Sequence, residues 1–262
     1  MTESRNTGRK DVPEEERIDV ADYLHQIERL AQKCGFESSI FAEIKGFRLP
    51  VLSRDLSREK ILYVSSGVHG DEPAGPLAIE EVLSDDGFNR EVGWVIFPVI
   101  NPTGLSQATR ETDDGIDLNR DYLLLESEEA RAHRHFLSAS GWHFWAALGL
   151  HEDWEASAGY IYEHNTENRP NPRNHLLEGL SSSVGIESGD TIDGWETYCP
   201  GVIHPSSDPQ LREYWPEQVY LMNHHTAMSY TIETPSSQKL ENRVRALGLC
   251  LRAFGSIDSW KV

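Results

Sequence analysis

Residues 61–83 read ILYVSSGVHGDEPAGPLAIEEVL. A short apolar run at 61–66 is followed by a glycine-containing turn and then by a helical repeat of apolar side chains from 73 to 83. This order predicts a buried strand, a turn and a helix, since a fully buried strand needs only a few consecutive apolar residues. Strand, turn and helix units of this kind build α/β domains.

The same alternation continues on both sides of this stretch. Further strands are predicted at residues 39–44, 48–53, 92–100, 144–150 and 227–232, and further helices at 20–33, 128–137 and 237–254. Asp19 can cap the first of these helices. Because strands that alternate with helices run mostly parallel and are covered on both faces, we expect a three-layer α/β/α sandwich with a mixed, mostly parallel central sheet.

The length of 262 residues fits one domain. We expect a loose polar arm over residues 1–17 and a single catalytic domain over 18–262. Residues 152–218 are rich in Asn, Pro, Ser and Gly, which predicts long loops, with a strand-like piece at 159–162 and a short helix near 174–182.

Composition excludes several classes of partner. The net charge is −19, from 43 acidic and 24 basic residues, which disfavours nucleic acid and anionic membranes because both repel a polyanion. No apolar run approaches the roughly 20 residues that a membrane helix needs, and the first residues show no signal-peptide core. The three cysteines are widely spaced, so we expect a cytoplasmic protein.

Two candidate metal ligands follow the strand at 61–66. His69 and Glu72 lie three residues apart, beyond the carboxyl end of that strand, where ligands gather in α/β sheets. His151 follows the strand at 144–150 and supplies a third ligand. Two imidazoles and a carboxylate suit Zn²⁺ and leave a fourth position open for water, so we predict one Zn²⁺ per chain.

A candidate general base lies near the end of the strand at 227–232. Glu233 stands in the segment SYTIETPS, residues 229–236. A carboxylate beside a zinc site can take the proton of the attacking water. The alternative interpretation is an acidic residue that favours the N-terminus of the following helix.

Between these candidates lie NPTG at residues 101–104, Arg110 and DLNR at 117–120. The order HxxE, NPxG, Arg, DxNR, His and Glu, over residues 61–236, resembles the zinc metallocarboxypeptidases of the carboxypeptidase A type, also called funnelins. They belong to a superfamily that also holds aspartoacylase and succinylglutamate desuccinylase. The resemblance implies that Asn119 and Arg120 bind a substrate carboxylate and that Arg110 stabilises the oxyanion. It also implies that Asp117 accepts a hydrogen bond from His69.

The chain departs from this family in two respects. The segment between NPTG and DLNR is shorter than in the digestive enzymes, and the position of the family's substrate-binding tyrosine is open between Tyr214 and Tyr220. The tandem His224 and His225 lack neighbouring ligands in the sequence, so we do not expect a second metal site there.

The resemblance predicts a zinc-dependent hydrolase that cleaves a C-terminal amide bond of a peptide. An N-acyl amino acid deacylase of the aspartoacylase or succinylglutamate desuccinylase type is the alternative. A non-catalytic binding module on the same fold is a third possibility. The expected partner is a peptide or an N-acyl amino acid.

Overall fold

The computed structural model describes residues 12–206 and 208–260. Residues 1–11 of the predicted polar arm lie outside this range. The rest of the arm includes one 3-10 turn, η1 (Glu14–Glu16), and the carboxylate of Glu16 pairs with Arg243.

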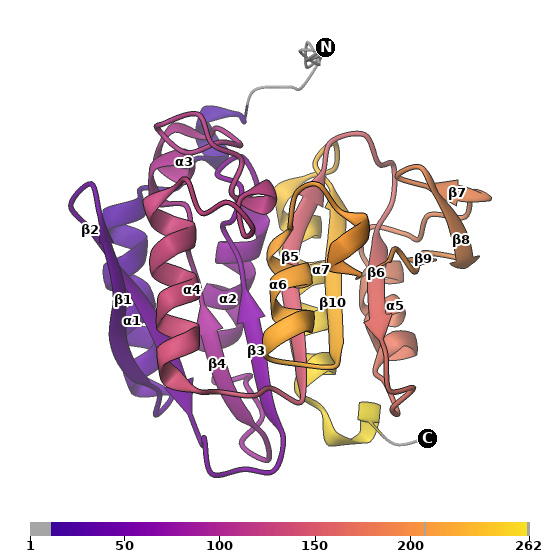
Figure 1. The fold of residues 1–262 in the computed structure, drawn as a ribbon, viewed down its shortest axis with the longest axis horizontal. Coiled ribbons are helices and arrows are strands. Elements are labelled where there is room, and N and C mark those ends of the chain that lie inside the picture. Colours follow the sequence, from indigo (N-terminus) through magenta and orange to yellow (C-terminus); the bar gives the residue numbers. More distant parts are fainter. Residues whose placement is uncertain (1–11, 207, 261–262) are drawn as a thin grey trace.

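The described residues form one sheet in the order β1-β2-β4-β3-β5-β10-β6-β9-β8-β7 (Figure 1). The strands are β1 (Glu37–Ile44), β2 (Phe47–Arg54), β3 (Ile61–Ser65), β4 (Gly93–Phe97), β5 (Ala146–Asp153), β6 (Tyr160–Asn165), β7 (Thr191–Ile192), β8 (Trp195–Cys199), β9 (Val202–Ile203) and β10 (Met228–Pro235). The four central strands, β4, β3, β5 and β10, run parallel to one another. Antiparallel pairs extend the sheet through β2 on one side and β6 on the other.

Helices cover both faces of the sheet. They are α1 (Val20–Lys33), α2 (Ala74–Ser84), α3 (Pro102–Gln107), α4 (Glu128–Ser140), α5 (Arg173–Ser181), α6 (Glu217–His224) and α7 (Leu240–Gly255). Helices α1, α2, α7 and α5 pack in a row on one face, and α4 and α6 lie on the other (Figure 1). The predicted three-layer α/β/α architecture is therefore confirmed.

The central strands β4, β3, β5 and β10 are buried because their side chains are mostly apolar on both faces, as expected for strands between two helical layers. Helix α1 begins and ends at the predicted residues, and the side chain of Asp19 accepts a hydrogen bond from the Asp22 N–H. None of the helices in the described ranges is long and apolar enough to cross a membrane.

Two features differ from the expectations. Helix α6 overlaps the region predicted as loops only at its first residues, Glu217 and Gln218. The sequence does not predict this helix, because these two residues are polar yet buried and so break the apolar repeat. In addition, β5 and β10 continue to Asp153 and Pro235, so His151 and Glu233 lie within paired strands rather than beyond their ends. Pairing to the adjacent strand holds both side chains in place.

Candidate metal centre

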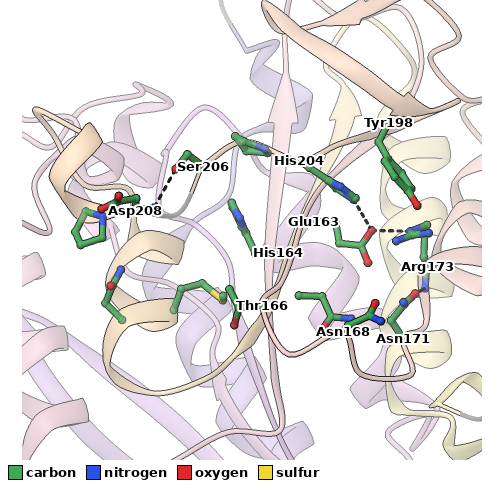
Figure 2. A pocket seen from close by; sticks show the side chains of 15 residues that line it. Glu163, His164, Thr166, Asn168, Asn171, Arg173, Tyr198, His204, Ser206 and Asp208 are labelled. Carbon is green, nitrogen blue, oxygen red and sulfur yellow. Dashed lines mark hydrogen bonds and ion pairs between the residues drawn. The ribbon is translucent and has the colours of Figure 1, made fainter.

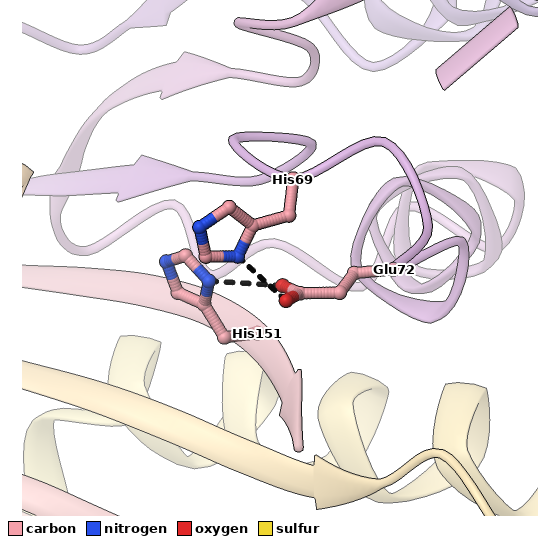
Figure 3. A group of neighbouring side chains, drawn as sticks. All are labelled: His69, Glu72 and His151. Atoms are coloured by element: carbon pink, nitrogen blue, oxygen red, sulfur yellow. Dashed lines mark hydrogen bonds and ion pairs between the residues drawn. The ribbon is translucent and has the colours of Figure 1, made fainter. Parts of the chain in front are cut away.

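Three predicted ligands meet at one place. His69 and Glu72 come from the loop between β3 and α2, and His151 comes from β5 (Figure 3). All three side chains are buried, and one potential ligand atom from each lies within 4.8 Å of the others. Within the described part of the chain no other cluster of three metal-binding side chains is found.

Close packing positions the loop that carries the first two ligands. Gly67 has a positive φ of 58°, a conformation that favours glycine. Gly70 packs directly on the main chain of Gly104, since a Cβ on Gly70 would lie 1.8 Å from the Gly104 carbonyl carbon. Where the loop enters α2, the N–H of Ala74 donates to Glu152 Oε1 at 2.7 Å.

The donor atoms fit a divalent metal. The Nδ1 atoms of His69 and His151 lie 2.6 and 2.9 Å from the two oxygens of Glu72. His69 Nε2 lies 3.2 Å from Asp117 Oδ1, a carboxylate oxygen that can only accept, so Nε2 carries a proton. His69 Nδ1 faces the Glu72 oxygen and also lies 3.3 Å from Arg110 Nη1, and a metal ion can take the place of a proton between Nδ1 and the carboxylate. Two imidazoles and a carboxylate are a donor set that zinc prefers.

Arg110 and Asp117 adjoin this cluster. Arg110 Nε donates to Asp117 Oδ2 at 2.8 Å, and Arg110 Nη1 lies 3.8 Å from Glu72 Oε1. Burial alone would raise the pKa of Asp117, but the hydrogen bond from His69 and the charge of Arg110 hold that pKa well below its usual range. The Asp117 carboxylate therefore contacts both the candidate ligand His69 and the guanidinium of Arg110.

Glu233 lies beside the cluster on the neighbouring strand. In the parallel register of β10 and β5 it is the partner of His151, and paired strands are about 4.8 Å apart. On its other side, the antiparallel register pairs it with Tyr160 of β6. Burial, followed by the charges of Glu72 and Asp153, raises the pKa of Glu233 well above its ordinary value.

Asn119 and Arg120 lie in a 3-10 turn, η2 (Leu118–Arg120), that starts next to Asp117. The Asn119 side chain is partly buried, and its Oδ1 accepts a hydrogen bond from the Glu217 N–H at 3.0 Å. The Arg120 side chain is exposed, and its Nη1 donates to the Asn119 carbonyl oxygen at 2.7 Å. The turn thus places an amide and a guanidinium on one short segment.

Tyr214 and Tyr220, the two candidates for a substrate-binding tyrosine, differ in their exposure. Tyr220 is buried and its hydroxyl lies 2.9 Å from His225 Nε2, whereas Tyr214 is 48% exposed. Tyr160 and Tyr162, which the sequence did not single out, lie on the strand next to Glu233, and their hydroxyl oxygens are 3.4 Å apart. Only the pairing of β6 with β10 reveals them.

A separate pocket of about 610 Å³ lies at the other end of β6 (Figure 2). Its lining includes Glu163, whose carboxylate accepts from Arg173 Nε at 2.5 Å and lies 3.0 Å from His204 Nε2. His164 points into this pocket from β6. None of the eight predicted site residues lines it.

Comparison with known proteins agrees with the fold and with the family resemblance. Residues 58–175 match the family model of the succinylglutamate desuccinylase/aspartoacylase catalytic domain. No match was found among curated proteins.

Solved structures of similar fold include a candidate metallopeptidase from Shewanella amazonensis SB2B. It has 23% identity and a TM-score of 0.77, over 90% of this chain and 92% of that one. A candidate metallopeptidase from Shewanella denitrificans OS217 has 23% identity and a TM-score of 0.74, over 90% and 89% of the two chains. A metallo-carboxypeptidase from Pseudomonas aeruginosa, in complex with (2-guanidinoethylmercapto)succinic acid, has 17% identity and a TM-score of 0.61, over 89% and 68%.

Proposed function

We propose that this chain hydrolyses an amide bond close to a free carboxylate in its substrate. This activity fits the superfamily that unites the zinc metallocarboxypeptidases with the succinylglutamate desuccinylases and aspartoacylases, to which we assign the chain. The observation that carries the proposal is the convergence of His69, Glu72 and His151, with Glu233 in register beside His151. These four residues come from three segments that are far apart in the sequence. A metal site and a base at one place are what amide hydrolysis requires.

His69, Glu72 and His151 would hold one Zn²⁺. When bound there, the ion supplies a Lewis acid that polarises a carbonyl and lowers the pKa of water toward about 7. The Glu233 carboxylate takes a proton from the attacking water and returns it to the leaving amine. The Arg110 guanidinium donates to the oxyanion that forms as water adds to the carbonyl carbon.

The substrate carboxylate is assigned to Asn119 and Arg120. A guanidinium and an amide N–H₂ both donate, and together they match the two oxygens of a carboxylate. This contact fixes the distance between the charged end of the substrate and the scissile bond. Hydrolysis then depends on holding the carbonyl beside Glu233 in a reactive orientation.

Two substrate classes fit this arrangement. One is a peptide that is cleaved at its C-terminal residue, the activity implied by the motif order. The other is an N-acyl amino acid, which is favoured by the match of residues 58–175 to a deacylase family model. In both, a carboxylate lies close to the amide that is broken.

A substrate panel separates these classes. Purified protein is incubated with C-terminal peptides, γ-glutamyl peptides and N-acyl amino acids, with and without a zinc chelator, and products are identified by mass spectrometry. We expect cleavage in one class, lost on chelation and restored by Zn²⁺. Folded protein that holds zinc but cleaves nothing in the panel would instead support a binding module.

Replacement of Glu233 by Gln tests the base. The amide keeps the shape of the side chain but cannot accept the proton, so kcat should fall by about 10²- to 10⁴-fold while zinc content stays near one per chain. Turnover at the wild-type rate in this variant removes Glu233 from the mechanism.

A further inference from the structure

Glu217 is a buried acid for which the proposed chemistry has no role. It is the first residue of α6, and its side chain is fully buried. Its two oxygens accept hydrogen bonds from the hydroxyls of Tyr63 and Ser65, both on β3, the latter at 2.7 Å. Because burial of a carboxyl group is costly unless its oxygens are bonded, these two contacts tie the N-terminus of α6 to β3.

The backbone of the same residue orients a predicted substrate contact. The Glu217 N–H donates to Asn119 Oδ1 at 3.0 Å. A backbone N–H can only donate, so the atom that faces it must be the amide oxygen, and Nδ2 of Asn119 must point the other way. Within residues 12–206 and 208–260, no protein acceptor is found for Nδ2. This amide group is therefore free to donate to a substrate carboxylate.

Further contacts join the same two segments. The Tyr122 N–H donates to the Trp215 carbonyl oxygen at 3.2 Å. The Tyr122 hydroxyl lies 2.7 Å from Nδ1 of the buried His133, and Nε2 of that ring lies 3.1 Å from the Tyr63 hydroxyl. Tyr63, His133 and Tyr122 thus form a buried chain of hydrogen bonds that leads from the carboxyl group of Glu217 back to the segment that carries Asn119.

Strand β3, to which Glu217 is bonded, leads directly into the candidate metal site. The strand ends at Ser65, and the loop that follows it carries His69 and Glu72. Glu217 therefore connects the strand that delivers two candidate metal ligands to the side chain that is assigned to the substrate carboxylate. Its contacts set the distance and orientation between the two parts of the site.

We infer that Glu217 is a positioning residue, whose side chain anchors α6 to β3 so that its backbone N–H holds the Asn119 amide ready for the substrate carboxylate. This inference rests on the proposed function, in which Asn119 contacts that carboxylate. Glu217 itself touches neither the substrate nor the metal site. Its loss should therefore weaken substrate binding and leave zinc binding intact.

The test compares three variants. Glu217→Ala removes both contacts to β3, whereas Glu217→Gln can keep both, because its oxygen accepts from one hydroxyl and its N–H₂ donates to the other. The matched control is Glu163→Ala, which removes another buried carboxylate, bonded to Arg173 and His204 in the pocket of Figure 2. For each variant, KM and kcat are measured with a substrate found in the panel, and zinc content is determined.

We expect Glu217→Ala to raise KM about fivefold to tenfold, since one orienting hydrogen bond contributes about 1 kcal/mol. Its kcat should change by less than about twofold, its zinc content should stay at the wild-type value, and Glu217→Gln should restore most of the lost affinity. Glu163→Ala should lower stability without changing KM. An unchanged KM in Glu217→Ala, or an equal rise in Glu163→Ala, would overturn the inference.

A readout that does not need turnover separates this inference from the proposed function. Hydrogen exchange of the residue 217 amide, followed by NMR, should accelerate at least tenfold in Glu217→Ala and stay near the wild-type rate in Glu217→Gln and Glu163→Ala. If no substrate in the panel is cleaved by the wild type, the proposed function fails while this measurement still reports on the anchor. Unchanged exchange in Glu217→Ala refutes the anchor whatever the activity.

Discussion

Gly70 lies between the candidate ligands His69 and Glu72, and adding one methyl group there tests how tightly the loop is held. In Gly70→Ala the new Cβ would lie 1.8 Å from the carbonyl carbon of Gly104 and 2.1 Å from the Leu105 nitrogen. Ordinary contacts begin near 3.4 Å, so the two main-chain segments must separate by about 1.6 Å. Neither obstacle is a flexible side chain that can turn away.

The segment on the other side of this contact has little freedom to retreat. The Gly104 N–H is held by Asn101 Oδ1 at 2.8 Å, and a Cβ on Gly104 would itself lie 2.6 Å from the Glu111 carbonyl oxygen. The ligand loop must therefore take most of the displacement. Metal ligands tolerate errors of only about 0.2 Å, so the site should lose its geometry.

We expect Gly70→Ala to bind Zn²⁺ at least about 100-fold more weakly than the wild type, since loss of a residue that only hydrogen-bonds to a metal ligand already costs about 10- to 100-fold in affinity. Affinity is measured by competition with a chromogenic zinc chelator, and thermal unfolding verifies that the variant is folded. The control is Gly248→Ala in α7, where the nearest atom to the new Cβ is the end of the Glu81 side chain at 3.2 Å and the Val82 side chain lies at an ordinary contact distance of 3.8 Å. A folded Gly70→Ala protein with wild-type zinc affinity would refute the reasoning.

Three further predictions concern single residues. Asp117→Asn should weaken zinc binding by about 10- to 100-fold in the same titration, because Asp117 contacts His69 Nε2; undiminished affinity would show that this contact does not support the ligand. Arg120→Ala should raise KM for a substrate with a free carboxylate and leave kcat nearly unchanged. An equal rise in KM for an analogue with a carboxamide in place of the carboxylate would argue against a contact between Arg120 and the carboxylate. Burial, offset in part by the hydroxyls of Tyr63 and Ser65, raises the pKa of Glu217 to about 7. From about pH 4.5 to 7 the folded state therefore binds more protons than the unfolded state, and the wild type loses stability as the pH rises through that window. Glu217→Gln does not titrate, so its free energy of unfolding, measured with urea, should rise by about 3 kcal/mol relative to the wild type between about pH 4.5 and 7. A difference between the two proteins that does not depend on pH would contradict the raised pKa.

Much of the fold is legible in the sequence because its main elements carry strong local patterns. The apolar repeat and the Asp19 cap define α1, and the apolar runs define the central strands that the structure pairs in parallel. Helix α6 is the instructive exception. Its buried polar residues, Glu217 and Gln218, accept hydrogen bonds from Ser65 and Ser229 on strands of the sheet, so no local period marks them as inward-facing.

Some residues of the candidate site can likewise be recognised in the sequence, whereas others are brought there only by the fold. The spacing of His69 and Glu72, and the place of His151 after an apolar run, mark all three as candidate ligands from residue type and position alone. Tyr160 and Tyr162 carry no such mark, since their nearness to Glu233 arises from the antiparallel pairing of β6 with β10.

The sequence by itself determined which chemical groups this chain offers and which strands carry them, because hydrophobic periodicity and motif spacing are local properties. The tertiary structure alone decided the register that sets Glu233 beside His151, the contact of Gly70 with Gly104, and the hydrogen bond from Glu217 to Asn119. These contacts join residues that are tens of positions apart in the chain. They arise only when the layers of the fold pack together, and no local pattern encodes the alignment of one strand or loop against another.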